Sequence, residues 1–123
     1  MTMYTAAMDE RIRVAVASGS CNTFADRVSL RQGACGAQIL SGLMPDADTY
    51  DLFGSLAPRP LQLQWGRRDP LIIHEPAQAG VRQIERCYRA AGAADRFEVH
   101  PFEGEHVFAF EAAQRWLDRW LLA

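Results

Sequence analysis

The sequence has no lysine, no long apolar run and no stretch that resembles a signal peptide. All 13 basic residues are arginines and the net charge is −2; only Arg67 and Arg68 are adjacent, so no basic patch for nucleic acid is expected. No segment approaches the roughly 18 apolar residues that a membrane-spanning helix requires. The N-terminus also lacks the basic start and apolar stretch of a signal peptide. We therefore expect a cytoplasmic protein that binds neither nucleic acid nor membranes.

The cysteines and histidines do not form a metal or redox motif. The cysteines are odd in number (Cys21, Cys35 and Cys87), and none belongs to a C-x-x-C pair or has a histidine at zinc-finger spacing. Free thiols are the simpler expectation, with a disulfide between Cys21 and Cys35 as the alternative. His74–Glu75 and Glu103–His106 lack the H-E-x-x-H spacing of a zinc site. We expect no metal and no other cofactor.

Strand patterns and helix patterns alternate along the 123 residues. The nearly continuous run Ile12–Ala17 predicts a strand buried on both faces. Leu61–Trp65 and Phe97–Phe102 instead alternate between apolar and polar residues, which predicts a second and a third strand. Apolar side chains spaced three and four residues apart predict the helices, which we expect at residues 3–8, 48–56, 76–91 and 108–122. Residues 19–50 otherwise carry no sustained period, and so long an irregular stretch is often functional.

This order of elements predicts an α/β protein. Strands that alternate with helices form a parallel sheet through right-handed crossovers, with helices packed on the sheet faces. The apolar content of 49% is that of a globular protein, and the length allows one core rather than two. We expect one three-layer domain over residues 1–123, with a mostly parallel sheet of about three strands flanked by helices.

Two residues that follow strands carry the suggestive chemistry. Asp69 lies four residues beyond Trp65, and His106 lies four residues beyond Phe102. The carboxyl ends of parallel strands meet at one edge of the sheet, so both loops open on the same side. An aspartate that accepts a hydrogen bond from one imidazole nitrogen prepares the other nitrogen to act as a base. The alternative is structural, because Asp-Pro is a common turn former and Gly-Glu-His is an ordinary loop sequence.

A nucleophile for this pair is missing from the sequence. The order Asp then His matches the latter part of the Ser, Asp, His order of α/β-hydrolases, in which the serine sits in a G-x-S-x-G turn. Neither Gly19–Thr23 nor Gly33–Ala37 fits that pattern. Ser20 and Cys35 remain only as weak alternatives.

Several other conspicuous residues have a structural interpretation. Met1, Met3 and Met8 are expected in the core of the first helix. Trp116 and Trp120 are four residues apart, which is the spacing of packed neighbours on one helix face. His100 falls inside the third strand and is expected on one of its faces.

The sequence resembles the α/β-hydrolase superfamily, in particular its dienelactone hydrolase-like and acetyl xylan esterase-like branch. The resemblance covers nearly the whole chain. It depends most on the Ala-Pro-Arg-Pro-Leu stretch before the second strand and on the Gly-Glu-His-Val-Phe stretch after the third. The segments that resemble the family are 6–19, 35–43, 56–69, 88–93 and 104–108.

The resemblance implies that Asp69 is the acid and His106 the general base of a serine hydrolase. It places the serine a few residues before Met1, so that residues 1–123 form a partial domain starting just after the nucleophile turn. The expected function is that of an incomplete serine hydrolase related to carboxylic ester hydrolases, whose complete form takes a small-molecule ester. The alternative is a non-catalytic association module that binds a second copy or another chain through strand Ile12–Ala17.

Overall fold

The computed structural model describes residues 1–29, 40 and 42–122. Its three strands form one parallel sheet in the order β1-β2-β3, with Ala15 beside Leu61 and Leu61 beside Phe97. The strands are β1 Ala15–Ser18, β2 Leu61–Gly66 and β3 Phe97–Phe102. The helices are α1 Thr2–Met8, α2 Phe24–Ser29, α3 Thr49–Gly54, α4 His74–Ala90 and α5 Phe110–Leu121, and a 3-10 turn, Ala94–Arg96, precedes β3.

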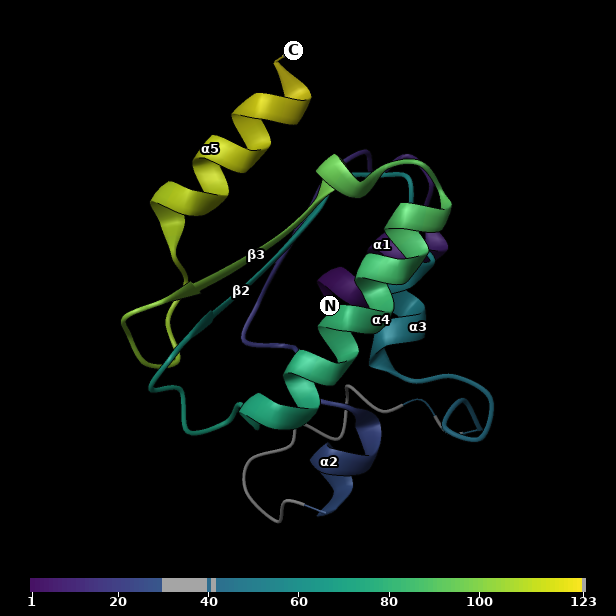
Figure 1. Cartoon of the computed structure of the whole chain (residues 1–123), viewed down its shortest axis with the longest axis vertical. Helices are drawn as coiled ribbons and strands as arrows, with labels where there is room; N and C mark the ends of the chain where they lie inside the picture. The colour runs from purple at the N-terminus through teal and green to yellow at the C-terminus, as the bar shows by residue number, and fades with distance from the viewer. Residues whose placement is uncertain (30–39, 41, 123) are drawn as a thin grey trace.

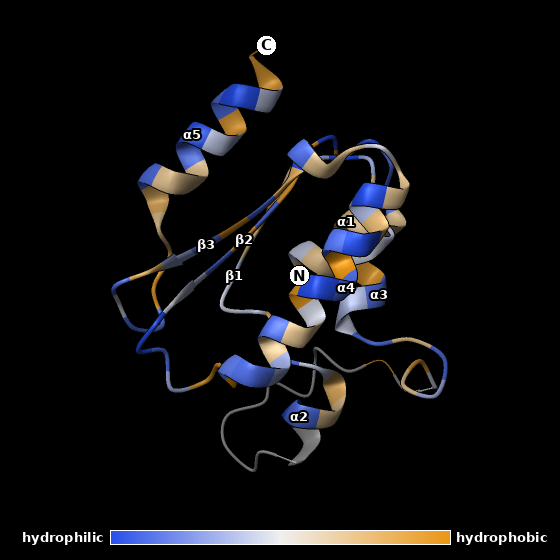
Figure 2. Ribbon diagram, in the orientation of Figure 1, coloured by the Kyte–Doolittle hydropathy of each residue, from blue (hydrophilic) through white to orange (hydrophobic). Residues whose placement is uncertain are grey.

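The helices lie on both faces of the sheet. Figure 1 shows α1, α3 and α4 on one side of the strands and α5 on the other. Figure 2 shows that α4 and α5 each carry both hydrophilic and hydrophobic segments, as helices that cover a sheet must. The predicted three-layer α/β class with a parallel sheet of three strands is confirmed.

The main core lies between the sheet and the first helical layer. Leu61 and Leu63 of β2 are almost fully buried in this core, together with Phe53 of α3 and Ile84 of α4. Burying a side chain of this size contributes about 2 kcal/mol relative to leaving it exposed. The other layer is held by α5, where Trp116 is 3% exposed and meets Trp120 edge to face at 5.7 Å, which agrees with the predicted packing of this pair.

The alternating pattern of β2 does not indicate a solvent-facing side. Gln62 and Gln64 are as buried as the leucines because β2 is the central strand and α5 covers its second face. The Gln62 amide donates to Glu98 Oε1 of β3 at 2.6 Å, and Gln64 Oε1 accepts from the Ala109 N–H at 2.6 Å. Polar residues in a strand can be buried in this way when neighbouring elements supply partners.

The first strand is shorter than predicted, and only alternate residues are buried. It begins at Ala15 rather than Ile12, because the Ile12 N–H bonds to Asp9 O and the Ile12 carbonyl accepts from the Arg59 guanidinium. Both backbone groups of Ile12 are therefore used outside the sheet. Within β1, Ala15 and Ala17 are buried and Val16 is half-buried. Burial on both faces was thus a wrong prediction for this strand.

The prediction for the methionines of α1 was correct at one position only. Met3 is 5% exposed and packs in the core, whereas Met1 and Met8 are 100% and 84% exposed. Residues 3 and 6 of this short helix face the sheet, so positions 1 and 8 fall on the opposite side. Among the described residues, no helix is long and apolar enough to span a membrane.

Candidate active site

Two loops meet at the carboxyl edge of the sheet, one after β2 and one after β3. The Arg67 N–H donates to Phe102 O at 2.8 Å, and the Arg68 N–H donates to Gly104 O at 2.9 Å. Gly66 makes this approach possible, because a Cβ at that position would lie 2.2 Å from Glu105 O. The end of β2 therefore holds the backbone of the histidine loop directly against the aspartate loop.

Asp69 and His106 form the contact that the sequence predicts. His106 Nδ1 lies 2.8 Å from Asp69 Oδ2, and the Leu71 N–H donates to Asp69 Oδ1 at 2.9 Å. The Asp69 side chain is 1% exposed, whereas that of His106 is 54% exposed. A neutral imidazole that donates from Nδ1 to a carboxylate has an unprotonated Nε2, which accepts a proton. The geometry is that of a base held by an acid; its use in catalysis stays a prediction.

The histidine ring reaches across β2 to the end of β1. A Cβ on Gly19, which follows β1, would lie 2.7 Å from His106 Cε1 and 3.6 Å from Asp69 Oδ2. Gly19 has a φ of +62°, in the left-handed region that favours glycine. A cavity of about 180 Å³ lies beside the ring; it is lined by Met1, Thr2, Met3, Ala17, Ser18, Gly19, Ser20 and His106.

The two serines of this cavity have hydroxyls engaged elsewhere. Ser18 Oγ donates to Val107 O at 3.3 Å, and Ser20 Oγ accepts from the Arg27 guanidinium at 3.2 Å. No hydrogen bond joins either hydroxyl to His106 within the described part of the chain. Cys35, the other weak candidate, lies outside the described residues.

The described cysteines do not supply an activated thiol here. Cys21 and Cys87 are free, and Cys35, the possible disulfide partner of Cys21, is not among the described residues. Cys21 is buried, and burial raises its pKa to about 12, so the thiol keeps its proton near neutrality. A nucleophile of this kind would have to be a thiolate.

The remaining titratable residues do not form a second site of this type. No group of three histidine, cysteine or acidic side chains that could hold a metal ion occurs among the described residues. His100 lies in β3 and stacks on Phe102 with ring centroids 6.2 Å apart, and His74 is the first residue of α4. Neither histidine joins Asp69 and His106.

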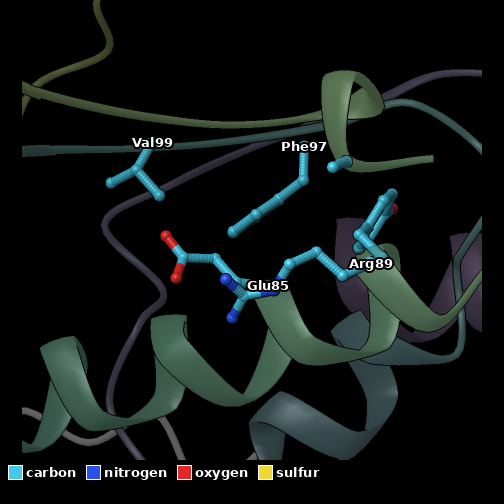
Figure 3. Close-up of a pocket in the computed structure, with 6 residues that line it drawn as sticks. Glu85, Arg89, Phe97 and Val99 are labelled. Carbon is cyan, nitrogen blue, oxygen red and sulfur yellow. The ribbon is translucent and has the colours of Figure 1, made fainter. Parts of the chain in front are cut away.

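A larger cavity, of about 440 Å³, opens between α4 and β3. Figure 3 shows Glu85 and Arg89 of α4 lining this cavity, opposite Phe97 and Val99 of β3. Phe97 begins β3, whereas the His106 loop follows the end of that strand. The cavity is therefore separate from the edge where Asp69 and His106 meet.

Sequence reasoning missed the residues that support the pair. The sequence patterns assign no role in the site to Gly66 or Gly19. Asn22 lies in the irregular stretch 19–50, and its side chain hydrogen-bonds to the aspartate loop. The signal available for Gly19 and Gly66 was a glycine directly after a strand, next to a suspected site; the sequence offers no comparable signal for Asn22.

Comparison with solved structures shows that the chain has part of an α/β-hydrolase-type fold. A carbohydrate esterase family 15 glucuronoyl esterase from Caldicellulosiruptor kristjansonii matches with a TM-score of 0.73 and 19% identity over 95% of this chain and 38% of its own. An esterase from Pyrococcus furiosus matches with a TM-score of 0.61 and 18% identity over 96% of this chain and 48% of its own. The chain thus spans less than half the length of either esterase. No family model and no curated protein matches the sequence.

Proposed function

We propose that this chain carries the acid–base half of a serine ester hydrolase related to the dienelactone hydrolase-like and acetyl esterase-like proteins. The observation that carries the proposal is the 2.8 Å contact between His106 Nδ1 and Asp69 Oδ2. The contact lies at the carboxyl edge of a parallel sheet, where such folds place their catalytic groups. The fold that the chain shares with two esterases supports the same reaction class.

In the proposed reaction His106 acts first as a base and then as an acid. Its Nε2 takes the proton of a serine hydroxyl while the serine oxygen attacks the carbonyl carbon of a carboxylic ester. The imidazolium then gives this proton to the departing alcohol, which leaves an acyl-serine. Water, deprotonated by the same Nε2, attacks the acyl group, and the acid is released as the serine regains its proton. Asp69 stays ionised throughout and stabilises the imidazolium.

The serine is proposed to lie outside residues 1–123. The cavity beside the exposed face of His106, bordered by Thr2 and by residues 18–20, is the place where its hydroxyl would enter. A positioned base contributes about 10²- to 10⁴-fold to a reaction, but only when a nucleophile is present for it to deprotonate. We therefore expect residues 1–123 to hydrolyse a small ester such as p-nitrophenyl acetate no faster than a histidine-dependent background.

Two measurements test this proposal. In proton NMR, the Nδ1–H of His106 is expected at low field and should disappear in Asp69→Asn but not in the matched surface variant Asp118→Asn. In the ester assay, turnover well above background that is abolished by Ser20→Ala or Cys35→Ala would reveal a nucleophile within the chain. That result would refute the proposal that the hydrolase is incomplete.

A second candidate function, association through the edge of β1, is favoured by the difference between the two sheet edges. Ala15 and Gly19 donate to β2, so the backbone groups of Val16 and Ser18 face outward. On β3 the Phe102 carbonyl faces β2, so the outward position next to it is Pro101, which has no N–H. An unprotected edge such as that of β1 pairs readily with another strand, whereas an edge proline hinders pairing.

The partner on this edge would be a second copy or another polypeptide. Light scattering of the purified chain tests the first case, with Val16→Pro expected to shift the mass toward the monomer because it removes one outward N–H. Val99→Pro makes the same change on the edge of β3 and serves as the control. A chain that is already monomeric at high concentration would exclude self-association.

A further inference from the structure

The segment between β1 and α2 lies against the aspartate loop and is joined to it by one side chain. Asn22 is 7% exposed, and its amide makes two hydrogen bonds to that loop. Its Nδ2 donates to Leu71 O, and its Oδ1 accepts from the Ile73 N–H at 3.0 Å. A carboxamide is suited to this role because it carries a donor and an acceptor side by side.

Leu71, whose carbonyl accepts the hydrogen bond from Asn22, also orients Asp69. The Leu71 N–H donates to Asp69 Oδ1 at 2.9 Å, which leaves Oδ2 to face His106. Leu71 is thus held at its carbonyl by Asn22 and at its N–H by the carboxylate. Movement of the Leu71 backbone would turn the carboxylate away from the imidazole.

Asn22 is itself anchored from α2. The Arg27 guanidinium donates to Asn22 O at 3.3 Å and to Ser20 Oγ at 3.2 Å, and Arg27 is 8% exposed. The support therefore passes from the buried Arg27 to Asn22, then to Leu71, and from there to Asp69. Each step is a hydrogen bond in a largely buried region, where such bonds are strengthened by the low dielectric.

We infer that Asn22 is a positioning residue that fixes the orientation of Asp69 toward His106. The inference rests on the proposed function only in that the Asp69–His106 pair is the acid–base unit that Asn22 serves. It assigns a role to the stretch Gly19–Thr23, which lacks the pattern of a nucleophile turn. It also explains why an amide, rather than a carboxylate, occupies position 22, since a carboxylate would face the Leu71 carbonyl without a proton to donate.

The test is nitrogen and proton NMR of the His106 ring in residues 1–123, at a pH where the imidazole is neutral. In the unmodified chain the proton is expected on Nδ1. In Asn22→Asp and in the milder Asn22→Ser, exchange of this proton with water should accelerate about tenfold, as expected for the loss of one buried hydrogen bond. The proton should also redistribute toward Nε2.

The control is Gln83→Ala, which removes a different side-chain amide, one that donates to Asp51 Oδ1 at 2.8 Å between α4 and α3. Circular dichroism identifies which Asn22 variants are folded. A folded Asn22→Ser with the exchange rate and tautomer of the control would overturn the inference and leave the proposed function standing. Conversely, if a complete enzyme that contains this chain were inactive, the proposed function would fail, but the effect of Asn22 on the His106 ring would be unchanged.

Discussion

Replacing Gly66 with alanine should separate the two loops of the site. The added Cβ would lie 2.2 Å from Glu105 O and 2.3 Å from Gly104 O, and both atoms belong to the backbone. The histidine loop would have to retreat by about 1.2 Å for the nearer atom to reach the 3.4 Å of an ordinary contact. No rotation of a side chain can relieve this overlap.

A retreat of this size is enough to break the interactions that define the site. The Arg68 N–H to Gly104 O bond, now 2.9 Å, and the His106 to Asp69 contact, now 2.8 Å, would both exceed hydrogen-bonding distance. Losing two such bonds should lower the free energy of unfolding by about 2 kcal/mol. The larger effect should be on His106, whose Nδ1–H signal is expected to disappear from the low-field region of the proton spectrum.

The assay compares Gly66→Ala with Gly92→Ala by thermal unfolding and proton NMR. Gly92 follows α4 with a φ of +66°, and nothing lies within 4 Å of a Cβ built on it. Alanine there should cost about 1 kcal/mol of backbone strain and leave His106 untouched. If Gly66→Ala kept the low-field signal while it lost the same stability as Gly92→Ala, the steric reasoning would be wrong.

Two further predictions concern buried groups away from the loops. Burial raises the pKa of Cys21 from 9.0 to about 12; the native thiol should therefore react with iodoacetamide at pH 8 far more slowly than in guanidinium. Because the unfolded chain loses this proton first, the contribution of Cys21 to stability should fall as the pH rises from 9 toward 12. Arg59→Met should lower the free energy of unfolding by about 3 kcal/mol in urea titrations. The reason is that the guanidinium donates to the carbonyls of Ala6, Asp9 and Ile12.

The layer order and the Asp69–His106 contact could be predicted because both follow from local patterns and general topology. Parallel strands place successive loops on one edge, so two residues at equal distances from their strands were expected to meet. The details that the sequence did not predict depend on partners that are distant in the sequence. Ile12 leaves the strand because Arg59 takes its carbonyl, and Gln62 is buried because Glu98 and α5 lie beside it.

The position of Asn22 illustrates the same limit within the site. Its two partners follow 49 and 51 residues later in the chain, and its own neighbours form no periodic pattern. Only the packed structure brings an irregular segment against the aspartate loop.

The backbone bonds between the end of β2 and the histidine loop limit how this site can be redesigned. Arg67 and Arg68 hold Phe102 and Gly104 in register, so an insertion on either side would shift the acid and the base together or pull them apart. Variants made to test the proposed function should therefore keep the lengths of both loops. The natural positions to vary are the apolar residues just beyond the bonded stretch, Val107, Phe108 and Phe110, which are 58%, 54% and 68% exposed. Their side chains can change size without entering the contact between Asp69 and His106.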